Sequence, residues 1–429
     1  MESLRKDNLH AMFRAKRARV LEDSASKTQS SAGKMDAERN QSNSRINGQD
    51  QVEESPHTSE QKLRQILETF GSAVSARDPT AIQTCLINMR YFVANHNNGG
   101  TYEVMIYCNT VAHLISLIQK DVLTDAPEIL KEVTWIIINF ASIRGHFCAE
   151  LIKAGLLDAL SEIMTVYILP VDIYENIIWL LSNICSEDDA GRDAVCGSNV
   201  LSKVVELSNH IRGPRIDECL VWLYCGVFGG TSPSVLTENQ ATALATKLVA
   251  TGRKYDSKNV LVDVFHGLNR YLSSSENIER QRVLLQPEFV DLLATYITSS
   301  DSEMARLCAE IAVRLARCLM YDQTELLTHP RITNELLRIA IQDKPVYSDE
   351  LKYLSMEFIT AMVVGSPKMM NSVVRDEKRL FEACGRNFVL GGSTDLLISC
   401  LNFITAYCFS ESKMERLAGM LRSNPEVGI

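Results

Sequence analysis

The sequence predicts an all-α fold, a right-handed superhelical solenoid of stacked helical repeats. Two observations predict it. The chain has three tryptophans, Trp135, Trp179 and Trp222, and successive ones stand 44 and 43 residues apart. From residue 61 onward, apolar residues recur at helical spacing, and strand-type alternation never extends over a useful length. Self-similarity at one period therefore organises most of the chain.

Helical repeats of about 40–47 residues are typical of HEAT and armadillo arrays. The first predicted pair of helices spans residues 61–75 and 80–95, and the clearest unit has one helix after Ala154-Gly155 and a longer one over 175–184. Later pairs cover 199–207 with 216–228, 240–250 with 259–272, 287–297 with 304–319, 331–341 with 350–363, and 378–383 with 394–409. Counting from residue 80, the long helix occurs eight times. We therefore predict about eight armadillo repeats over residues 61–412, because each layer buries its apolar face only by stacking on the next.

The two ends of the chain differ from the array. Residues 1–23 form a short basic segment that contains Arg14, Lys16, Arg17 and Arg19. Residues 24–60 are rich in Ser, Gln, Asn and charged residues, and such a composition predicts a disordered linker. A flexible linker of this length spans roughly 35 Å, so the basic segment is able to reach the array. Residues 413–429 are predicted to be a C-terminal tail.

Charge and composition narrow the function. The net charge is −9, and because the first sixty residues cancel, all of it belongs to residues 61–429. An acidic array argues against nucleic acid as a ligand and favours basic partners. The longest apolar runs, such as 133–141, are far shorter than the ~20 residues that cross a bilayer, and no secretory signal is predicted. The twelve cysteines include no Cys-x-x-Cys pair, which predicts buried thiols in a reducing compartment and no metal or cofactor.

The tryptophans have polar companions one helical turn away. Asn139 and Asn183 follow the first two at i+4, whereas Gly226 follows the third. An indole face can hold the stem of a Lys or Arg, a carboxamide can bond to a peptide group, and a nearby acid can pair with the charge. The sequence therefore predicts a groove for an extended cationic peptide. Its predicted lining residues are Trp135, Asn139, Glu175, Trp179, Asn183, Glu187, Glu218, Trp222, Phe265 and Asn269.

Each of these residues also has a simpler interpretation. A tryptophan is usually well buried, so the indoles could serve core packing. The acids could belong to a solvated helix face. The common period and the Trp-x-x-x-Asn spacing favour the groove for the tryptophans, and both interpretations of the acids stay open.

The chain resembles the importin-α family of armadillo adaptors for nuclear import. The resemblance rests on the Trp-x-x-x-Asn helices, on Ala154-Gly155-Leu156-Leu157 and on Asn183-Ile184-Cys185-Ser186-Glu187, and it is strongest over residues 105–230. It implies an adaptor, present in cytoplasm and nucleus, that links the nuclear localisation signals of cargo proteins to importin-β. It also implies that Glu187 reads a key lysine of the signal. The basic segment is similar to the start of the importin-β-binding region, and 16–19 to its autoinhibitory cluster.

The departures from the family pattern indicate a divergent member. Gly226 replaces the third asparagine, and Ile143 and Cys148 stand where the family has small and hydroxyl residues. The later repeats contain no tryptophan, so a two-part signal is expected to bind poorly beyond the first groove. The basic segment is also shorter than the family's arginine-rich helix.

The sequence also bears on two other classes of function, an enzyme and a scaffold without import activity. The chain contains no His-Glu-x-x-His, Gly-x-Ser-x-Gly or phosphate-loop motif, so no enzyme activity is predicted. The alternative to an import adaptor is an armadillo scaffold that binds another protein partner, with import activity reduced or lost.

Overall fold

A computed structural model of the chain describes residues 56–96, 99–118, 127–143, 145–166, 169–211, 214–230, 232, 234–273, 284–318, 329–342, 347–365 and 377–409. Within these ranges every regular element is an α-helix and no strand occurs, which confirms the predicted all-α class. Residues 56–60, assigned to the linker from sequence, already belong to the first described helix. The rest of that linker, the basic segment and the predicted tail lie outside the described residues.

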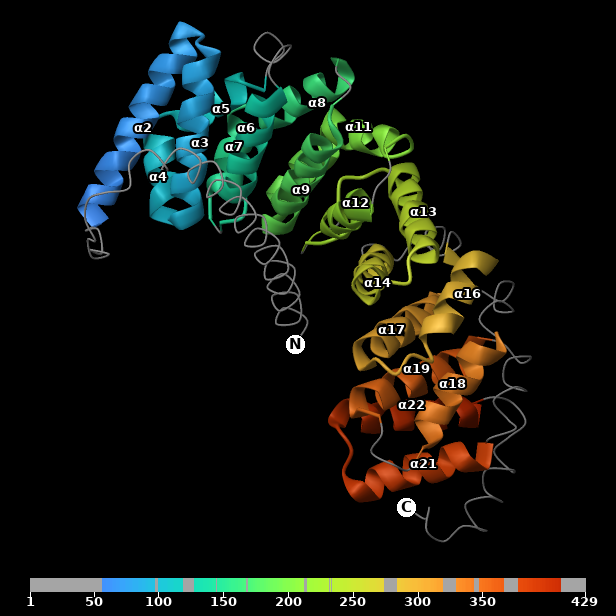
Figure 1. Cartoon of the computed structure of the whole chain (residues 1–429). Helices are drawn as coiled ribbons and strands as arrows, with labels where there is room; N and C mark the ends of the chain where they lie inside the picture. The colour runs from blue at the N-terminus through green and yellow to red at the C-terminus, as the bar shows by residue number, and fades with distance from the viewer. Residues whose placement is uncertain are drawn as a thin grey trace, which may run out of the picture. The chain divides into compact units, whose positions relative to one another are not determined.

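The chain divides into two compact units, 1–223 and 224–429, whose boundary falls within one helix. The helices up to that boundary are α2 (Pro56–Ala76), α3 (Pro79–Asn95), α4 (Gly99–Tyr107), α5 (Thr110–Ser116), α6 (Pro127–Phe140), α7 (Phe147–Lys153), α8 (Leu156–Val166), α9 (Val171–Glu187), α10 (Asp189–Gly197), α11 (Asn199–Leu207) and α12 (Pro214–Val227) (Figure 1).

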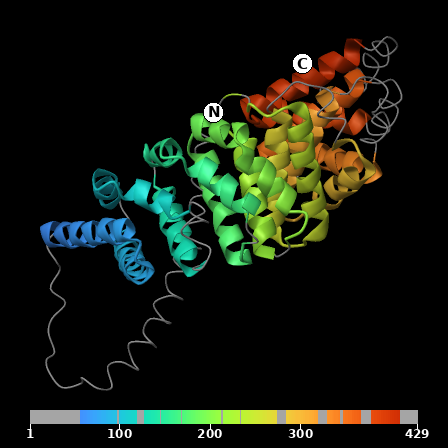
Figure 2. The same ribbon diagram turned by 90° about the horizontal axis from the view of Figure 1, so that it is seen from above.

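Layers in the first unit consist of three helices, two short and one long. They are α4–α6, α7–α9 and α10–α12, and three helices per repeat is the armadillo arrangement. The long helices α3, α6 and α9 pack against one another in order (Figures 1 and 2). The sequence predicted no more than two helices per layer: the short first helix of each layer was missed, and so was α5 in the first of them.

Local sequence signals set the ends of these helices. The Asp78 side chain accepts hydrogen bonds from the backbone N–H groups of Thr80 and Ala81, and Pro79 opens α3, as is usual for a capped helix start. Gly155 has φ +92° between α7 and α8, a conformation that glycine adopts at little cost. Asp78 and Pro79 thus set the start of the long helix α3, and Gly155 lets the chain turn between α7 and α8.

The second unit is described as helix pairs. They are α13 (Glu238–Lys254) with α14 (Lys258–Ser273), α16 (Pro287–Tyr296) with α17 (Ser302–Cys318), α18 (Pro330–Ile341) with α19 (Asp349–Gly365), and α21 (Glu377–Leu390) with α22 (Thr394–Phe409). In this unit α14, α17, α19 and α22 pack in order. Together with α3, α6, α9 and α12, the described residues contain the eight long helices predicted from sequence.

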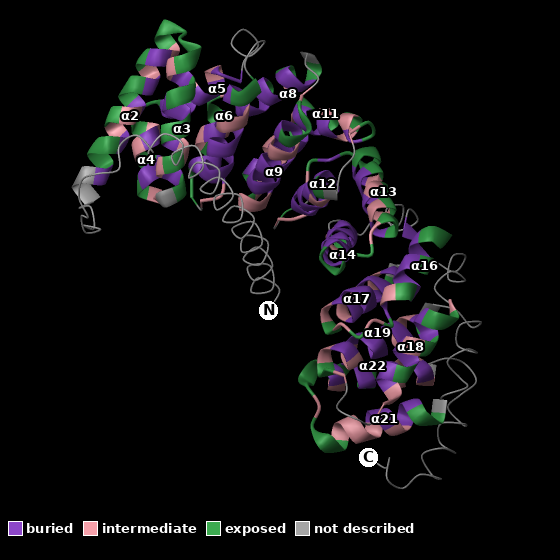
Figure 3. Ribbon diagram, viewed as in Figure 1, coloured by how far each residue is buried: buried purple, intermediate pink, exposed green. Residues whose placement is uncertain are grey.

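The layers are held together by apolar burial and by polar links one repeat apart. Ile136, Ile137 and Ile138 are all buried on α6, as expected for a helix covered on every side. Buried residues line the helix sides that face neighbouring layers (Figure 3). Across the layers, Asn176 Nδ2 donates to Thr134 Oγ1 at 3.2 Å, and these residues are 42 apart in sequence. The repeat of the sequence is therefore also the repeat of the contacts.

Candidate functional site

Three successive long helices of the first unit carry the tryptophans. Trp135 lies on α6, Trp179 on α9 and Trp222 on α12. Their exposed fractions are 8%, 3% and 8%, and the ring centroids of Trp179 and Trp222 are 6.3 Å apart. The structure thus brings the predicted rings to equivalent places on neighbouring layers, and it packs them more deeply than an open groove requires. We call these three rings and the acids one turn before them on their helices the ladder.

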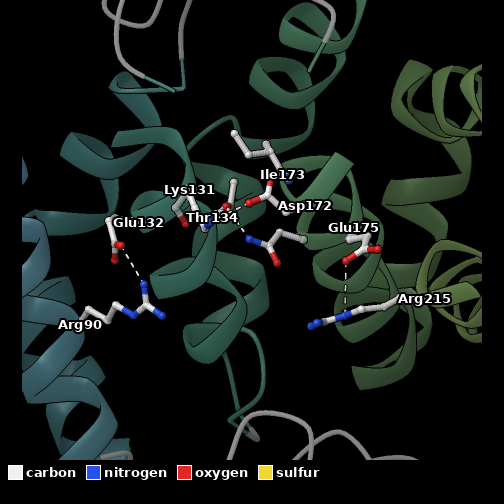
Figure 4. Close-up of polar contacts among 9 residues, drawn as sticks. Arg90, Lys131, Glu132, Thr134, Asp172, Ile173, Glu175 and Arg215 are labelled. Atoms are coloured by element: carbon white, nitrogen blue, oxygen red, sulfur yellow. Dashed lines mark hydrogen bonds and ion pairs between the residues drawn. The ribbon is translucent and has the colours of Figure 1, made fainter. Parts of the chain in front are cut away.

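The face of the first indole is covered by an arginine of the same chain. Arg90, on α3, holds its guanidinium carbon 4.8 Å from the centroid of the Trp135 ring. Its Nη1 donates to Glu132 Oε1 at 2.7 Å, and Glu132 precedes Trp135 by one turn on α6. The guanidinium therefore has an aromatic face and a carboxylate at once (Figure 4, where Arg90 and Glu132 are drawn).

The second indole has the same arrangement. Arg215, near the start of α12, has its guanidinium carbon 5.7 Å from the Trp179 centroid. Its Nε is 3.4 Å from Glu175 Oε2 (Figure 4), and Glu175 precedes Trp179 by one turn on α9. The Arg215 side chain is 48% exposed. Two consecutive layers thus bind a guanidinium with a ring and an acid.

The carboxyl groups of Glu132 and Glu175 are partly buried, and burial shifts the pKa of each. Burial raises the pKa of Glu132, and the opposing charge of Arg90 only partly offsets that effect. Burial likewise raises the pKa of Glu175 against the attraction of Arg215. A partly buried carboxylate is stabilised by a paired cation. These two positions consequently favour a positive group beside them.

The asparagine side chains bond to the helices themselves. Asn139 is buried, and its Nδ2 donates to the carbonyl of Trp135 at 2.8 Å. Asn183 is also buried, and its Nδ2 lies 3.4 Å from the carbonyl of Ile138 on α6. These amide donors are engaged within and between layers. Because Asn139 and Asn183 are only 3% and 4% exposed, little of either side chain is open to a peptide backbone.

The remaining predicted acids of the first unit lie at the two ends of the long helices. Glu187, in the last turn of α9, accepts a hydrogen bond from the backbone N–H of Gly145 at 3.1 Å. It therefore reaches the loop that follows α6. Glu218 is partly buried on α12, one turn before Trp222.

Phe265 and Asn269 belong to the second unit, on α14. Phe265 is 0% exposed and packs against Tyr296 with ring centroids 6.0 Å apart. This corrects the expectation that Phe265 lines a groove, because a ring without exposed surface belongs to the core. Asn269 Nδ2 donates to Glu310 Oε2 at 2.6 Å, across to α17.

Arg90, Arg215 and Glu132 were not among the residues predicted from sequence. The available signal was opposite charge at one repeat, since Arg90 and Glu132 are 42 residues apart. Nor were Tyr91 and Asn95, which stand 44 residues before Trp135 and Asn139 and continue the aromatic-x-x-x-Asn pattern onto α3. Tyr91 is 67% exposed, so the pattern begins on an open ring.

Other features of the described residues bear on the function classes. No group of three or more His, Cys, Asp or Glu side chains that could hold a metal ion is found among them. No helix within the described part of the chain is long and apolar enough to cross a membrane. Of the eleven cysteines whose side chains the structure describes, nine are buried thiols and none forms a disulfide. The basic residues Arg14, Lys16, Arg17 and Arg19 lie outside the described residues.

Comparison with known proteins gives a likeness of fold. No protein family matches the sequence, and no curated protein matches it. An engineered protein of known crystal structure is similar, with TM-score 0.59 and 13% identity over 85% of this chain and 88% of its own. A designed armadillo repeat protein in complex with the peptide (KR)4 covers 59% of this chain and 99% of its own, with 18% identity and TM-score 0.48. Another designed armadillo repeat protein has 17% identity, the same coverage and the same TM-score.

The assignment of the fold rests on the helices of the chain and on the first of these structures. Stacked helical layers with one repeat of sequence and contacts are the defining features of a solenoid. The chain is an α-solenoid.

Proposed function

We propose that this chain is a binding protein that holds an extended, Lys/Arg-rich segment of a partner protein along α6, α9 and α12. In line with the resemblance to importin-α, the partner segment would be a nuclear localisation signal. The basic segment 1–23 would join the cargo to importin-β, and the protein would work between cytoplasm and nucleus.

One observation carries the proposal: two consecutive layers hold a guanidinium between an indole and a carboxylate. For Trp135 the cation is 4.8 Å from the ring, and for Trp179 it is 5.7 Å from the ring. A cation–π contact contributes about 0.5–2 kcal/mol, and a hydrogen bond to a charged group about 1.5–3 kcal/mol. A basic side chain of a ligand would find the same two partners. The charge of −9 carried by residues 61–429 supports attraction of such a ligand.

The test is a titration of a fluorescent Lys/Arg-rich peptide against the full chain, followed by anisotropy. In the double variant Glu132→Gln, Glu175→Gln we expect a loss of affinity of about tenfold or more, because both cation sites lose their charge. The matched control is Glu162→Gln, which removes an exposed acid on α8, away from the ladder. The control removes one charge and the double variant removes two. If the control lost half as much binding free energy as the double variant, only the net charge of the chain would matter.

A second arm addresses the import role. Importin-β should bind the full chain and lose binding when residues 1–23 are removed. A chain that binds the basic peptide but not importin-β would be a peptide-binding scaffold without adaptor activity.

The alternative function is a scaffold for a different protein partner. The observation that favours it is the burial of all three indoles, each less than a tenth exposed. In this alternative the contacts of Arg90 with Trp135 and of Arg215 with Trp179 stabilise the stacking of the layers, and the partner binds elsewhere. A lack of binding by the basic peptide, with the fold intact by circular dichroism, would decide for this alternative.

A further inference from the structure

We propose that two sites of the ladder, Trp135 with Glu132 and Trp179 with Glu175, are selective for arginine over lysine. Arg90 and Arg215 occupy these sites as internal ligands until an arginine of the partner takes their place. This inference rests on the proposed function and adds the chemical identity of the ligand group and the group that it displaces.

The geometry of the first site matches a planar, forked cation. The guanidinium carbon of Arg90 lies over the Trp135 ring, 4.8 Å from its centroid, while Nη1 donates to Glu132 Oε1 at 2.7 Å. A guanidinium can stack and donate from its edge at the same time, whereas an ammonium is a compact point charge that is strongly hydrated. A lysine entering this site would therefore lose one of the two contacts.

The second site has the same composition but is built from the opposite direction along the chain. Arg90 comes from α3, which precedes α6, whereas Arg215 comes from α12, which follows α9. If both sites were copies of one repeat, both arginines would come from the preceding layer or both from the following layer. That it comes from both sides indicates that the ring and the acid together attract a guanidinium from whichever neighbour can reach.

A lysine beside the first ring has a different partner. Lys131 precedes Trp135 by one turn on α6, yet its Nζ pairs with Asp172 on α9 at 2.7 Å (Figure 4). The ring face is taken by Arg90 instead. Within the chain, therefore, an arginine and not the nearby lysine occupies the ring, as the proposal expects for a ligand.

The internal arginine of the second site is the easier one to displace. Its contact with Glu175 is 3.4 Å, against 2.7 Å for the pair of Arg90 and Glu132. The Arg215 side chain is 48% exposed, whereas that of Arg90 is 18% exposed. Exposed ion pairs contribute little and exchange readily. Exchange should begin at Trp179.

The experiment compares two peptides of equal length and charge, one with arginine and one with lysine at every basic position. Each is titrated by calorimetry against the full chain and the variants Arg215→Ala and Arg215→Lys. We expect the wild type to prefer the arginine peptide. We also expect Arg215→Ala to bind it about fivefold more tightly or better, because the internal competitor is gone. Arg215→Lys keeps the charge and should gain in the same direction.

The matched control is Arg64→Ala. The guanidinium carbon of Arg64 lies 5.2 Å from the centroid of the Tyr107 ring, and its Nη2 is 2.7 Å from Glu60 Oε1. The variant therefore removes one positive charge with the same two kinds of contact, at a place away from the ladder. It should leave peptide affinity close to that of the wild type.

The outcomes separate the two proposals. Equal binding of both peptides, or an equal gain in Arg215→Ala and Arg64→Ala, overturns the arginine exchange and leaves the peptide-binding function standing. No binding of either peptide to any folded variant overturns both.

Discussion

His266 is a buried histidine on α14 in the second unit, and its titration should be visible in the stability of the protein. Burial lowers its pKa, and the carboxylate of Glu303, 3.5 Å from Nε2, opposes this only in part. The unfolded chain has a histidine pKa of about 6.5. A group whose pKa is lowered by folding stabilises the fold above the unfolded value, and that stability is lost as pH falls toward the folded value.

We therefore predict that the urea midpoint of the wild type, followed by far-UV circular dichroism, falls between about pH 7.5 and about pH 5. The variant His266→Asn should show a smaller fall, whatever its stability at the higher pH. His210→Asn, which changes an exposed histidine, is the control and should behave as the wild type. A fall of the same size in all three proteins would assign the effect to other groups.

At the residue scale, the sequence could place the rings but not what covers them. The period of the tryptophans predicted that Trp135 and Trp179 occupy equivalent positions, and the structure confirms this on α6 and α9. It could not predict that Arg90 and Arg215 lie over them. Which side chain reaches a ring in the next layer depends on the offset between neighbouring helices, and spacing within one helix carries no information on that offset.

At the element scale, the packing of α10 against α9 depends on one glycine. A Cβ added at Gly191 would stand 2.8 Å from the carbonyl oxygen of Ile184. The backbone N–H of Gly191 also donates to Asp188 Oδ1, the cap of α10, at 2.6 Å. The two helices therefore approach more closely here than an alanine allows.

Gly191→Ala should lower the free energy of unfolding by about 1–3 kcal/mol, because the clash outweighs the better helix propensity of alanine. The control is Gly197→Ala in the same helix, where nothing lies within 4 Å of an added Cβ. It should leave the stability unchanged or raise it by up to about 1 kcal/mol. Urea denaturation measures both, and similar values for the two variants would contradict the close approach.

The helices themselves differed in how well sequence predicted them. The long helices were predicted close to their bounds, for example 80–95 for α3 (Pro79–Asn95) and 259–272 for α14 (Lys258–Ser273), because several turns of apolar periodicity define a helix clearly. The short helices α4 and α7, of nine and seven residues, were missed. Two turns seldom show a clear period, although the nine residues of α11 were predicted with their bounds, and the stability of such short helices depends on tertiary packing.

At the scale of the whole molecule, the three tryptophans all lie in the first unit, so their fluorescence reports mainly on that unit. Layers of a repeat protein contact mainly their neighbours, and stability is close to a sum of local contributions. Phe403 on α22 is buried in the second unit and packs against Phe381, with ring centroids 5.5 Å apart.

We predict that Phe403→Ala, which costs about 3–5 kcal/mol locally, shifts part of the far-UV circular dichroism transition to lower urea and leaves the tryptophan midpoint unchanged. Leu401→Ala, at a position on the same helix that is 49% exposed, should alter neither signal. If both signals of Phe403→Ala shifted together by the same amount, the two units would unfold as one.

The polar links between layers have a consequence for how such a chain can change its length. Asn176 and Thr134 are 42 residues apart, and Asn269 and Glu310 are 41 apart. Insertion or loss of one complete repeat keeps the remaining helices in the same stacking register, whereas a deletion of a few residues inside a layer shifts the donor away from its acceptor. Such a chain is open to growth or shortening by whole layers over evolutionary time and resistant to smaller steps.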